Sequence, residues 1–436
     1  MILESVTIIS LFTLAFGLIS GRIEKSILTP PMIFATFGLL ISPFVSQLLN
    51  LSVDNEVVDI IATTTLVFVL FTDASRIDFK LLKQQYQLPL RLLGIGLPLT
   101  ILLGSGFAIA LFPQLNIWES AAVATILAPT DAALGQAVVN SPNVPVRIRQ
   151  ALNIESGLND GICLPILLIF LSLAESAGGE QTVASWGSFA LAQLVMGPVV
   201  GILVGYLGGQ LIATTARSHW MTENYQRLSL LSLAALAFCL AEPLGGNGFI
   251  AAFCAGLTLG NTHQELCPRL YEYGETEGQF FILVTFVIFG GLMVLPVLTQ
   301  MQGRVILYAV LSLTAARLLS VSLSLVGMKL RWDTQLFLGW FGPRGVASIL
   351  YVLMVLNRDA IQGREQIFSI VVSTVLLSIF AHGLSAFPGA NWYAQRVEKD
   401  KSLPTAEHQT VAEMPVRLPY RSRYGQQTAI SNLPEA

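Results

Sequence analysis

The residues best suited to chemistry are acids and amides inside an otherwise apolar segment, residues 147–173, which is long enough to cross a membrane. Two carboxylates and two amides stand close together there, in the run Asn153-Ile154-Glu155-Ser156-Gly157-Leu158-Asn159-Asp160. An acid at the centre of a membrane helix costs roughly 2.5 to 3.5 kcal/mol, so such side chains are expected to face a cavity or one another. A functional site is therefore the first interpretation of this segment.

Helical spacing separates these side chains into two faces. Ser156 and Asp160 lie one turn apart on one face, and Glu155 and Asn159 lie one turn apart on the adjoining face. We expect the first face to bind a ligand. The side chains of the second face can then bond to neighbouring helices.

The ligand predicted for this face is a small, hard cation. Asp160 and Ser156, together with Thr130 and Asp131 of the preceding apolar segment, offer only oxygen atoms. Oxygen sets of this kind bind alkali and alkaline-earth ions, and no His or Cys competes for a softer metal. Na+ is the expected ion, with K+ and Li+ left open. Because Asp160 can hold either a proton or a cation, competition between the two is sufficient for antiport.

Composition predicts an all-α polytopic membrane protein. Of 436 residues, 53% are hydrophobic and 12% charged, whereas soluble domains carry about 25% charged residues. Apolar runs of helical length predict thirteen spans within residues 1–388, followed by a flexible cytoplasmic tail at 389–436. A net charge of −3 without a basic cluster argues against nucleic acid. The four cysteines show no CxxC spacing, so no cofactor is expected.

The distribution of basic residues orients the chain. With thirteen spans and the N-terminus outside, nineteen of the 24 basic residues fall on the cytoplasmic side, and only Arg304, Arg358 and Arg364 fall opposite. This satisfies the positive-inside rule and predicts a cytoplasmic C-terminus, in a cell or inner membrane. The remaining two, Arg317 and Arg344, lie inside spans eleven and twelve and need a partner.

Two predicted spans contain a proline near the middle. Pro129 interrupts span five and Pro343 interrupts span twelve, where a proline removes an N–H group and clashes with the preceding turn. The spans are seven apart, so two halves with one fold would cross the membrane in opposite directions. Paired broken helices in an inverted repeat indicate a midplane site in a secondary transporter.

Three motifs carry a resemblance to the monovalent cation:proton antiporter family, and to its NhaP-like branch. They are Ala128-Pro129-Thr130-Asp131, Glu155-Ser156-Gly157-Leu158-Asn159-Asp160-Gly161 and Gly342-Pro343-Arg344-Gly345. The resemblance covers about residues 1–390 and implies thirteen helices in an NhaA-like inverted repeat and Na+/H+ exchange. It also implies a homodimer, with core helices at about 91–173 and 303–387 and dimerisation or scaffold helices at about 2–74 and 186–299.

The resemblance also implies roles for individual residues. Arg317 should pair with Glu155, and Arg344 should pair with Asp73, although Asp73 could equally ligate the ion or be a solvated helix end. Within the family, a tandem Asn-Asp pair such as Asn159-Asp160 marks electroneutral exchangers, which implies 1:1 exchange. Asn159 cannot be charged and Arg317 cannot release its proton, so the residues agree with that implication.

Three other functions are compatible with parts of the sequence. A K+/H+ antiporter would use the same oxygen ligands, and a cation channel would use similar polar residues without needing paired broken helices. An intramembrane protease is disfavoured, because the HExxH motif is absent and the four histidines are scattered. The chain is therefore not expected to be an enzyme.

Overall fold

The computed structural model describes residues 2–23, 26–43, 56–131, 134–139, 141, 144–177, 183–399 and 407, and these contain helices and no strand. In chain order the α-helices are α1 (Ile2–Ile23), α2 (Pro30–Ile41), α3 (Glu56–Ser75), α4 (Phe79–Gln85), α5 (Gln87–Arg91), α6 (Leu97–Leu111), α7 (Ile117–Ile126), α8 (Gln136–Val139), α9 (Val146–Ala177), α10 (Val183–Arg217), α11 (Glu223–Ala241), α12 (Gly248–Thr262), α13 (Cys267–Ile288), α14 (Leu295–Thr299), α15 (Gly303–Leu311), α16 (Arg317–Ser324), α17 (Trp332–Trp340), α18 (Val346–Leu356) and α19 (Arg364–Lys399). Segments of π-helix join some of them, at Leu92–Gly96, Phe289–Val294 and Ser312–Ala316, and 3-10 turns occur at Glu242–Leu244 and Gln264–Leu266.

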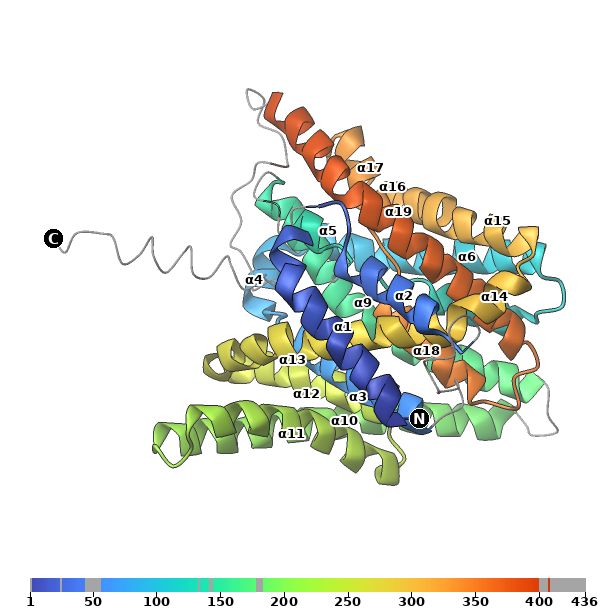
Figure 1. Cartoon of the computed structure of the whole chain (residues 1–436). Helices are drawn as coiled ribbons and strands as arrows, with labels where there is room; N and C mark the ends of the chain where they lie inside the picture. The colour runs from blue at the N-terminus through green and yellow to red at the C-terminus, as the bar shows by residue number, and fades with distance from the viewer. Residues whose placement is uncertain are drawn as a thin grey trace.

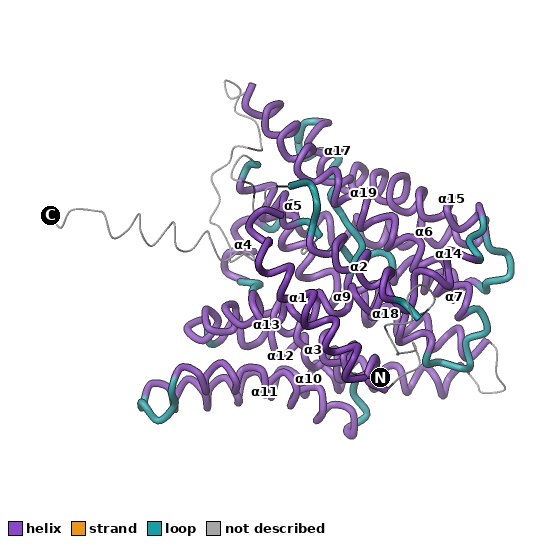
Figure 2. The backbone as a smooth tube through the Cα atoms, in the orientation of Figure 1, coloured by secondary structure: helices purple, strands orange, loops and turns teal. Residues whose placement is uncertain are grey.

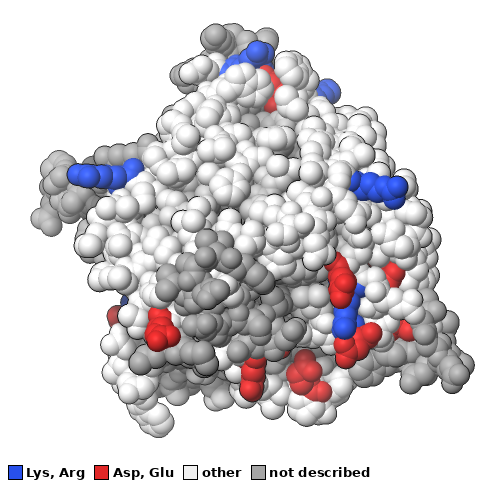
Figure 3. All heavy atoms as spheres, turned by 45° about the vertical axis from the view of Figure 1, so that its right-hand side comes forward, with Lys and Arg blue, Asp and Glu red and all other residues white. Residues whose placement is uncertain are grey.

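The helices form a bundle of membrane-spanning length. Within the described ranges, nine helical spans are long and apolar enough to cross a bilayer, and four shorter apolar helices accompany them. Together these agree with the thirteen predicted spans. Helices α10 and α11 lie along one side of the bundle and α15 and α19 along the other, and the tube view shows the same helical arrangement without strands (Figures 1 and 2). One face is largely free of charged side chains, with acids near its lower edge (Figure 3). The chain is an integral membrane protein.

Both predicted breaks are present. The first half-helix, α7, is well started by a capping box between Asn116 and Glu119, and it ends at Ile126, just before Pro129. In span twelve, α17 ends at Trp340 and α18 begins at Val346, so the segment around Pro343 is unwound. The two unwound segments meet, because the Asp131 N–H donates to the Pro343 carbonyl oxygen over 2.8 Å.

An inverted repeat is visible in the helices that flank the breaks. Span four (α5, Leu92–Gly96 and α6) and span eleven (α15, Ser312–Ala316 and α16) each contain a π-helical segment. Each π segment packs against the helix that follows the other one, the first against α16 and the second against α6. This reciprocal packing is the mark of two related halves.

Close packing links α10, α12 and α3 into a layer. Gly205 of α10 lies against the backbone of α12, and Gly256 and Gly260 of α12 lie against the end of α3. A Cβ atom at these last two positions would collide with the carbonyl oxygens of Phe71 and Ser75. Glycine therefore allows these helices to approach closely, as is common between membrane helices.

The predicted start of the tail at residue 389 is wrong. Helix α19 continues through Pro388 to Lys399, and Tyr393 is buried there, stacked on Phe337 of α17 at a centroid distance of 4.2 Å. Apolar contact with α17 explains the extension, since a membrane helix tolerates a proline when its neighbours support it. Of residues 400–436, only Glu407 lies among the described residues.

Candidate ion-binding site

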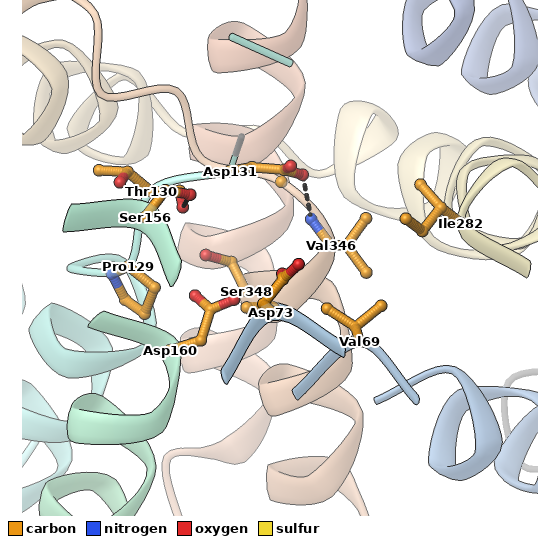
Figure 4. Close-up of a pocket in the computed structure, with 12 residues that line it drawn as sticks. Val69, Asp73, Pro129, Thr130, Asp131, Ser156, Asp160, Ile282, Val346 and Ser348 are labelled. Carbon is orange, nitrogen blue, oxygen red and sulfur yellow. Dashed lines mark hydrogen bonds between the residues drawn. The ribbon is translucent and has the colours of Figure 1, made fainter. Parts of the chain in front are cut away.

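A small cavity of about 10 Å³ lies where the two broken helices meet. Its polar lining comes from α3, from the span-five break, from α9 and from the start of α18. The polar residues are Asp73, Thr130, Asp131, Ser156, Asp160 and Ser348, drawn in Figure 4. Five of these six, all but Ser348, are among the site residues predicted from the sequence, and the structure brings them together.

Asp131 caps the half-helix of the opposite break. Its Oδ2 accepts a hydrogen bond of 2.9 Å from the Val346 N–H, the first N–H of α18 (Figure 4). A carboxylate is favoured there, because free N–H groups and the helix dipole make this end positive. Gly345 is needed beside it, since a Cβ at that position would collide with the Asp131 carboxylate.

Arg344 makes the reciprocal contact, and the predicted Arg344–Asp73 pair is wrong. The Arg344 Nη1 group donates to the carbonyl oxygens of Ala128 and Pro129, the latter at 3.0 Å. These carbonyls follow the end of α7, where the helix dipole is negative and a cation is favoured. Each half-helix end therefore receives a side chain of opposite charge from the other break. The guanidinium is fully buried.

The two predicted faces of α9 are both found. Ser156 and Asp160 line the cavity, and the Ser156 hydroxyl also donates to the Thr130 carbonyl oxygen at 2.5 Å. On the adjoining face, Asn159 donates from Nδ2 to the Thr130 hydroxyl oxygen at 2.7 Å. Asn159 is fully buried. The span-five break is thus held against α9 by two hydrogen bonds.

The predicted contact between Glu155 and Arg317 is present. Arg317 donates from both terminal nitrogens to the two Glu155 carboxylate oxygens, with Nη2–Oε2 at 2.8 Å. Both side chains are about 2% exposed. A bidentate pair of this kind offsets the burial of two charges that would each be very costly alone. It also fixes α9 to span eleven.

Asp73 reaches the cavity from α3 rather than standing in solvent as a helix end. Figure 4 shows Asp73 close to Ser348 and Asp160, with its carboxylate pointing toward the part of the cavity that carries Asp131 and Val346, and Val69 one turn earlier lines the same cavity. The wall opposite α9 therefore also carries an acid. Its role as a possible ion ligand stays a prediction.

Sequence reasoning missed two residues of α18. The Tyr351 hydroxyl donates to the Asp160 carbonyl oxygen at 2.7 Å, and the Ser348 hydroxyl donates to the Ile126 carbonyl oxygen at 2.7 Å. Both are buried. Their spacing of three places them on one face of an otherwise apolar half-helix, which was the available signal.

Carboxylates alone do not form a metal site here. Among the residues that the structure describes, no three acidic, histidine or cysteine side chains are close enough to hold one ion together. A cation in the cavity would therefore also need hydroxyl and carbonyl oxygens, which Ser156, Thr130 and Ser348 place on its wall. A weakly held, exchangeable ion suits such a set better than a resident metal does.

Broken helices that cross in an inverted repeat around buried carboxylates define the architecture of a secondary ion transporter. The transmembrane sodium/hydrogen exchanger family model matches residues 8–392. The chain belongs to this family of membrane transporters.

Individual relatives agree with the family. A probable Na+/H+ antiporter of Schizosaccharomyces pombe is 26% identical over 87% of this chain and 54% of its own length. The K+/H+ antiporter NhaP of Alkalimonas amylolytica is 25% identical over 91% of this chain and 68% of its own length. The chain thus spans only about half the length of the yeast relative. The solved sodium proton antiporter MjNhaP1 of Methanocaldococcus jannaschii shares the fold, with a TM-score of 0.74 at 21% identity over 90% of this chain and 99% of that chain.

Proposed function

We propose that the chain exchanges a monovalent cation for a proton across the membrane by alternating access. The observation that carries this proposal is the position of Asp160, which lines the cavity at the crossing while its neighbour Asn159 is committed to Thr130. Asp160 can be neutralised by a proton or by a cation, and the two cannot occupy it together. Occupancy by one therefore displaces the other.

The supporting residues have separate tasks in this proposal. Ser156 and Thr130 supply neutral oxygens beside Asp160, and Asp73 faces it from α3. Glu155 and Arg317 neutralise each other, so they hold the helices without taking part in exchange. Asp131 and Arg344 stabilise the ends of the half-helices that border the ion.

Na+ is the favoured cation and K+ the second candidate. Relatives of similar identity are named as Na+/H+ and as K+/H+ antiporters, and oxygen ligands serve both ions. A cation channel would conduct without coupling to protons. Proton movement driven by a cation gradient separates exchange from conduction.

The assembly and orientation belong to the same proposal. The bias of basic residues supports an outside N-terminus and a cytoplasmic C-terminus in a cell membrane. A homodimer is supported by the family resemblance, with the layer of α3, α10 and α12 on the scaffold side. The cargo is the cation and the proton, and no further cofactor is invoked.

The test uses proteoliposomes that contain a pH-sensitive dye. Addition of Na+, Li+ or K+ to acid-loaded vesicles should move protons with the wild-type protein. Asp160→Asn should abolish this signal while the protein still folds, since the amide cannot exchange charge. Asp359→Asn is the matched control, because that side chain is 94% exposed. Robust exchange by well-folded Asp160→Asn would refute the proposal.

A further inference from the structure

A second cavity, distinct from the one that contains Asp160, lies between α17 and the C-terminal part of α19. It holds about 340 Å³ of space. Its wall is aromatic and aliphatic, with Leu336, Phe337, Trp340, Phe341, Pro388 and Trp392 as the main contributors. None of these residues lines the cavity that contains Asp160.

The polar groups on this wall satisfy each other. Trp340 donates from its indole N–H to the Ser385 hydroxyl oxygen at 2.9 Å, and that hydroxyl donates to the Ala381 carbonyl oxygen at 2.7 Å. An occupant therefore gains nothing from hydrogen bonding to these groups. The chemistry of the groove favours a hydrocarbon chain.

The length of α19 places the groove near one edge of the hydrocarbon layer. Helix α19 begins at Arg364, and at 1.5 Å per residue roughly 20 residues cross the ~30 Å hydrocarbon layer. Pro388 and Trp392 then fall at the far edge of that layer. Trp332 and Trp340 of α17 lie at the same end, and tryptophan is enriched at this depth.

The positively charged side chain of Arg396 lies next to the groove, beside Trp392. The Arg396 guanidinium carbon lies 5.4 Å from the centre of the Trp392 ring and 5.9 Å from that of Trp332. Arg396 is exposed, one turn beyond Trp392 and away from the hydrocarbon. The contact with the rings involves the positive charge of the guanidinium, and this exposed group carries five N–H donors that can bind a phosphate.

We propose that this groove binds one anionic phospholipid, with an acyl chain against α17 and α19 and the headgroup phosphate on Arg396. The lipid would act on the ion site through Phe341, without contacting that site itself. Phe341 lines the groove and also lines the small pocket that contains Thr130, Asp131 and Pro343. An occupied groove would thus support the α17 side of the span-twelve break.

The headgroup contact is tested by lipid titration of the purified full-length protein in detergent. Phosphatidylglycerol should raise the melting temperature of wild type more than phosphatidylcholine with the same acyl chains does. Native mass spectrometry should count one tightly bound lipid. Arg396→Gln should reduce the phosphatidylglycerol affinity about tenfold and remove its advantage. Arg304→Gln, at an exposed arginine in the first turn of α15, should behave as wild type.

The groove itself is tested with Leu336→Trp, which fills it with an apolar side chain. This variant should lose the tightly bound lipid of either headgroup. Equal phosphatidylglycerol affinity in wild type and Arg396→Gln would overturn the headgroup assignment. A bound lipid that survives Leu336→Trp would overturn the groove. If Leu336→Trp fails to fold, the Arg396→Gln comparison still decides.

Discussion

The buried pair of Glu155 and Arg317 should behave as one unit. Removing either partner leaves an uncompensated charge in the protein interior, which costs about 3 to 5 kcal/mol, whereas removing both leaves none. We therefore expect Glu155→Gln and Arg317→Met each to lower the melting temperature sharply, and the double variant to lose less than the sum. Thermal unfolding of the four proteins in detergent measures this coupling.

A double-mutant cycle on an exposed ion pair provides the control for that measurement. Arg217 and Glu265 form an ion pair at 2.6 Å, but their side chains are 70% and 46% exposed. Exposed pairs are weakened by solvent, so this cycle should show little coupling. Strict additivity at Glu155 and Arg317 would mean that their contact does not stabilise the fold.

The residues of the candidate site differ in how well the sequence predicts their contacts. The spacing of Ser156, Glu155, Asn159 and Asp160 predicts which side chains share a face of α9, because residues four apart lie one helical turn apart. Arg344 could not be assigned in the same way. Its partners are backbone carbonyls exposed only after α7 ends, and the sequence does not show how two breaks pack against each other.

Asp131 should act through the half-helix that it caps. In Asp131→Asn the amide oxygen can still accept the Val346 N–H, but the negative charge at the positive end of α18 is lost. We expect the protein to fold and its apparent Km for Na+ to rise about tenfold, equivalent to about 1.4 kcal/mol. Dye-based exchange rates over a Na+ series give the Km, and the melting temperature reports folding.

Two comparisons make the Asp131 result specific. Asp131→Ala loses the hydrogen bond as well as the charge and should also lower the melting temperature, because a lost cap costs about 1 kcal/mol. Asp359→Asn should leave Km unchanged. A wild-type Km in Asp131→Asn would show that the charge at this helix end does not affect ion binding.

A proline correctly predicts a helix break only where the backbone groups that it leaves without a helical partner find another partner. Pro129 and Pro343 end helices, and the segments that they free bind each other and Arg344. Pro165, Pro198 and Pro388 remain inside α9, α10 and α19, where the surrounding helices support a continuous span. Two of the three π-helical segments, Leu92–Gly96 and Phe289–Val294, are followed within two residues by Pro98 and Pro296, whereas Ser312–Ala316 has no such neighbour.

The complete transport cycle should move no net charge. One proton or one cation neutralises Asp160 in each direction, while Asn159 is uncharged and Arg317 is held by Glu155. Initial rates of Na+/H+ exchange should therefore be independent of membrane potential. Proteoliposomes at equal pH with a Na+ gradient and a valinomycin-clamped potential of either sign provide the measurement, and traces without Na+ correct for any K+ exchange.

A dependence of rate on voltage would identify a second charge carrier. Asp131 and Asp73 are the candidates, because both line the cavity with Asp160. Asp131→Asn and Asp73→Asn in the same assay would show which of them restores independence from voltage. This outcome would reject 1:1 exchange but would leave coupled antiport intact.

The glycine contacts between α12 and α3 hold Asp73 in place relative to α12. Because Gly256 and Gly260 hold the end of α3 backbone to backbone, Asp73 cannot slide along the membrane normal without α12. Asp160 belongs to α9, which is bonded instead to the span-five break and to span eleven. The separation of these two carboxylates should therefore change only when α9 and the two broken spans move relative to α3 and α12, and a distance measured between labels on α3 and α9 would report that movement.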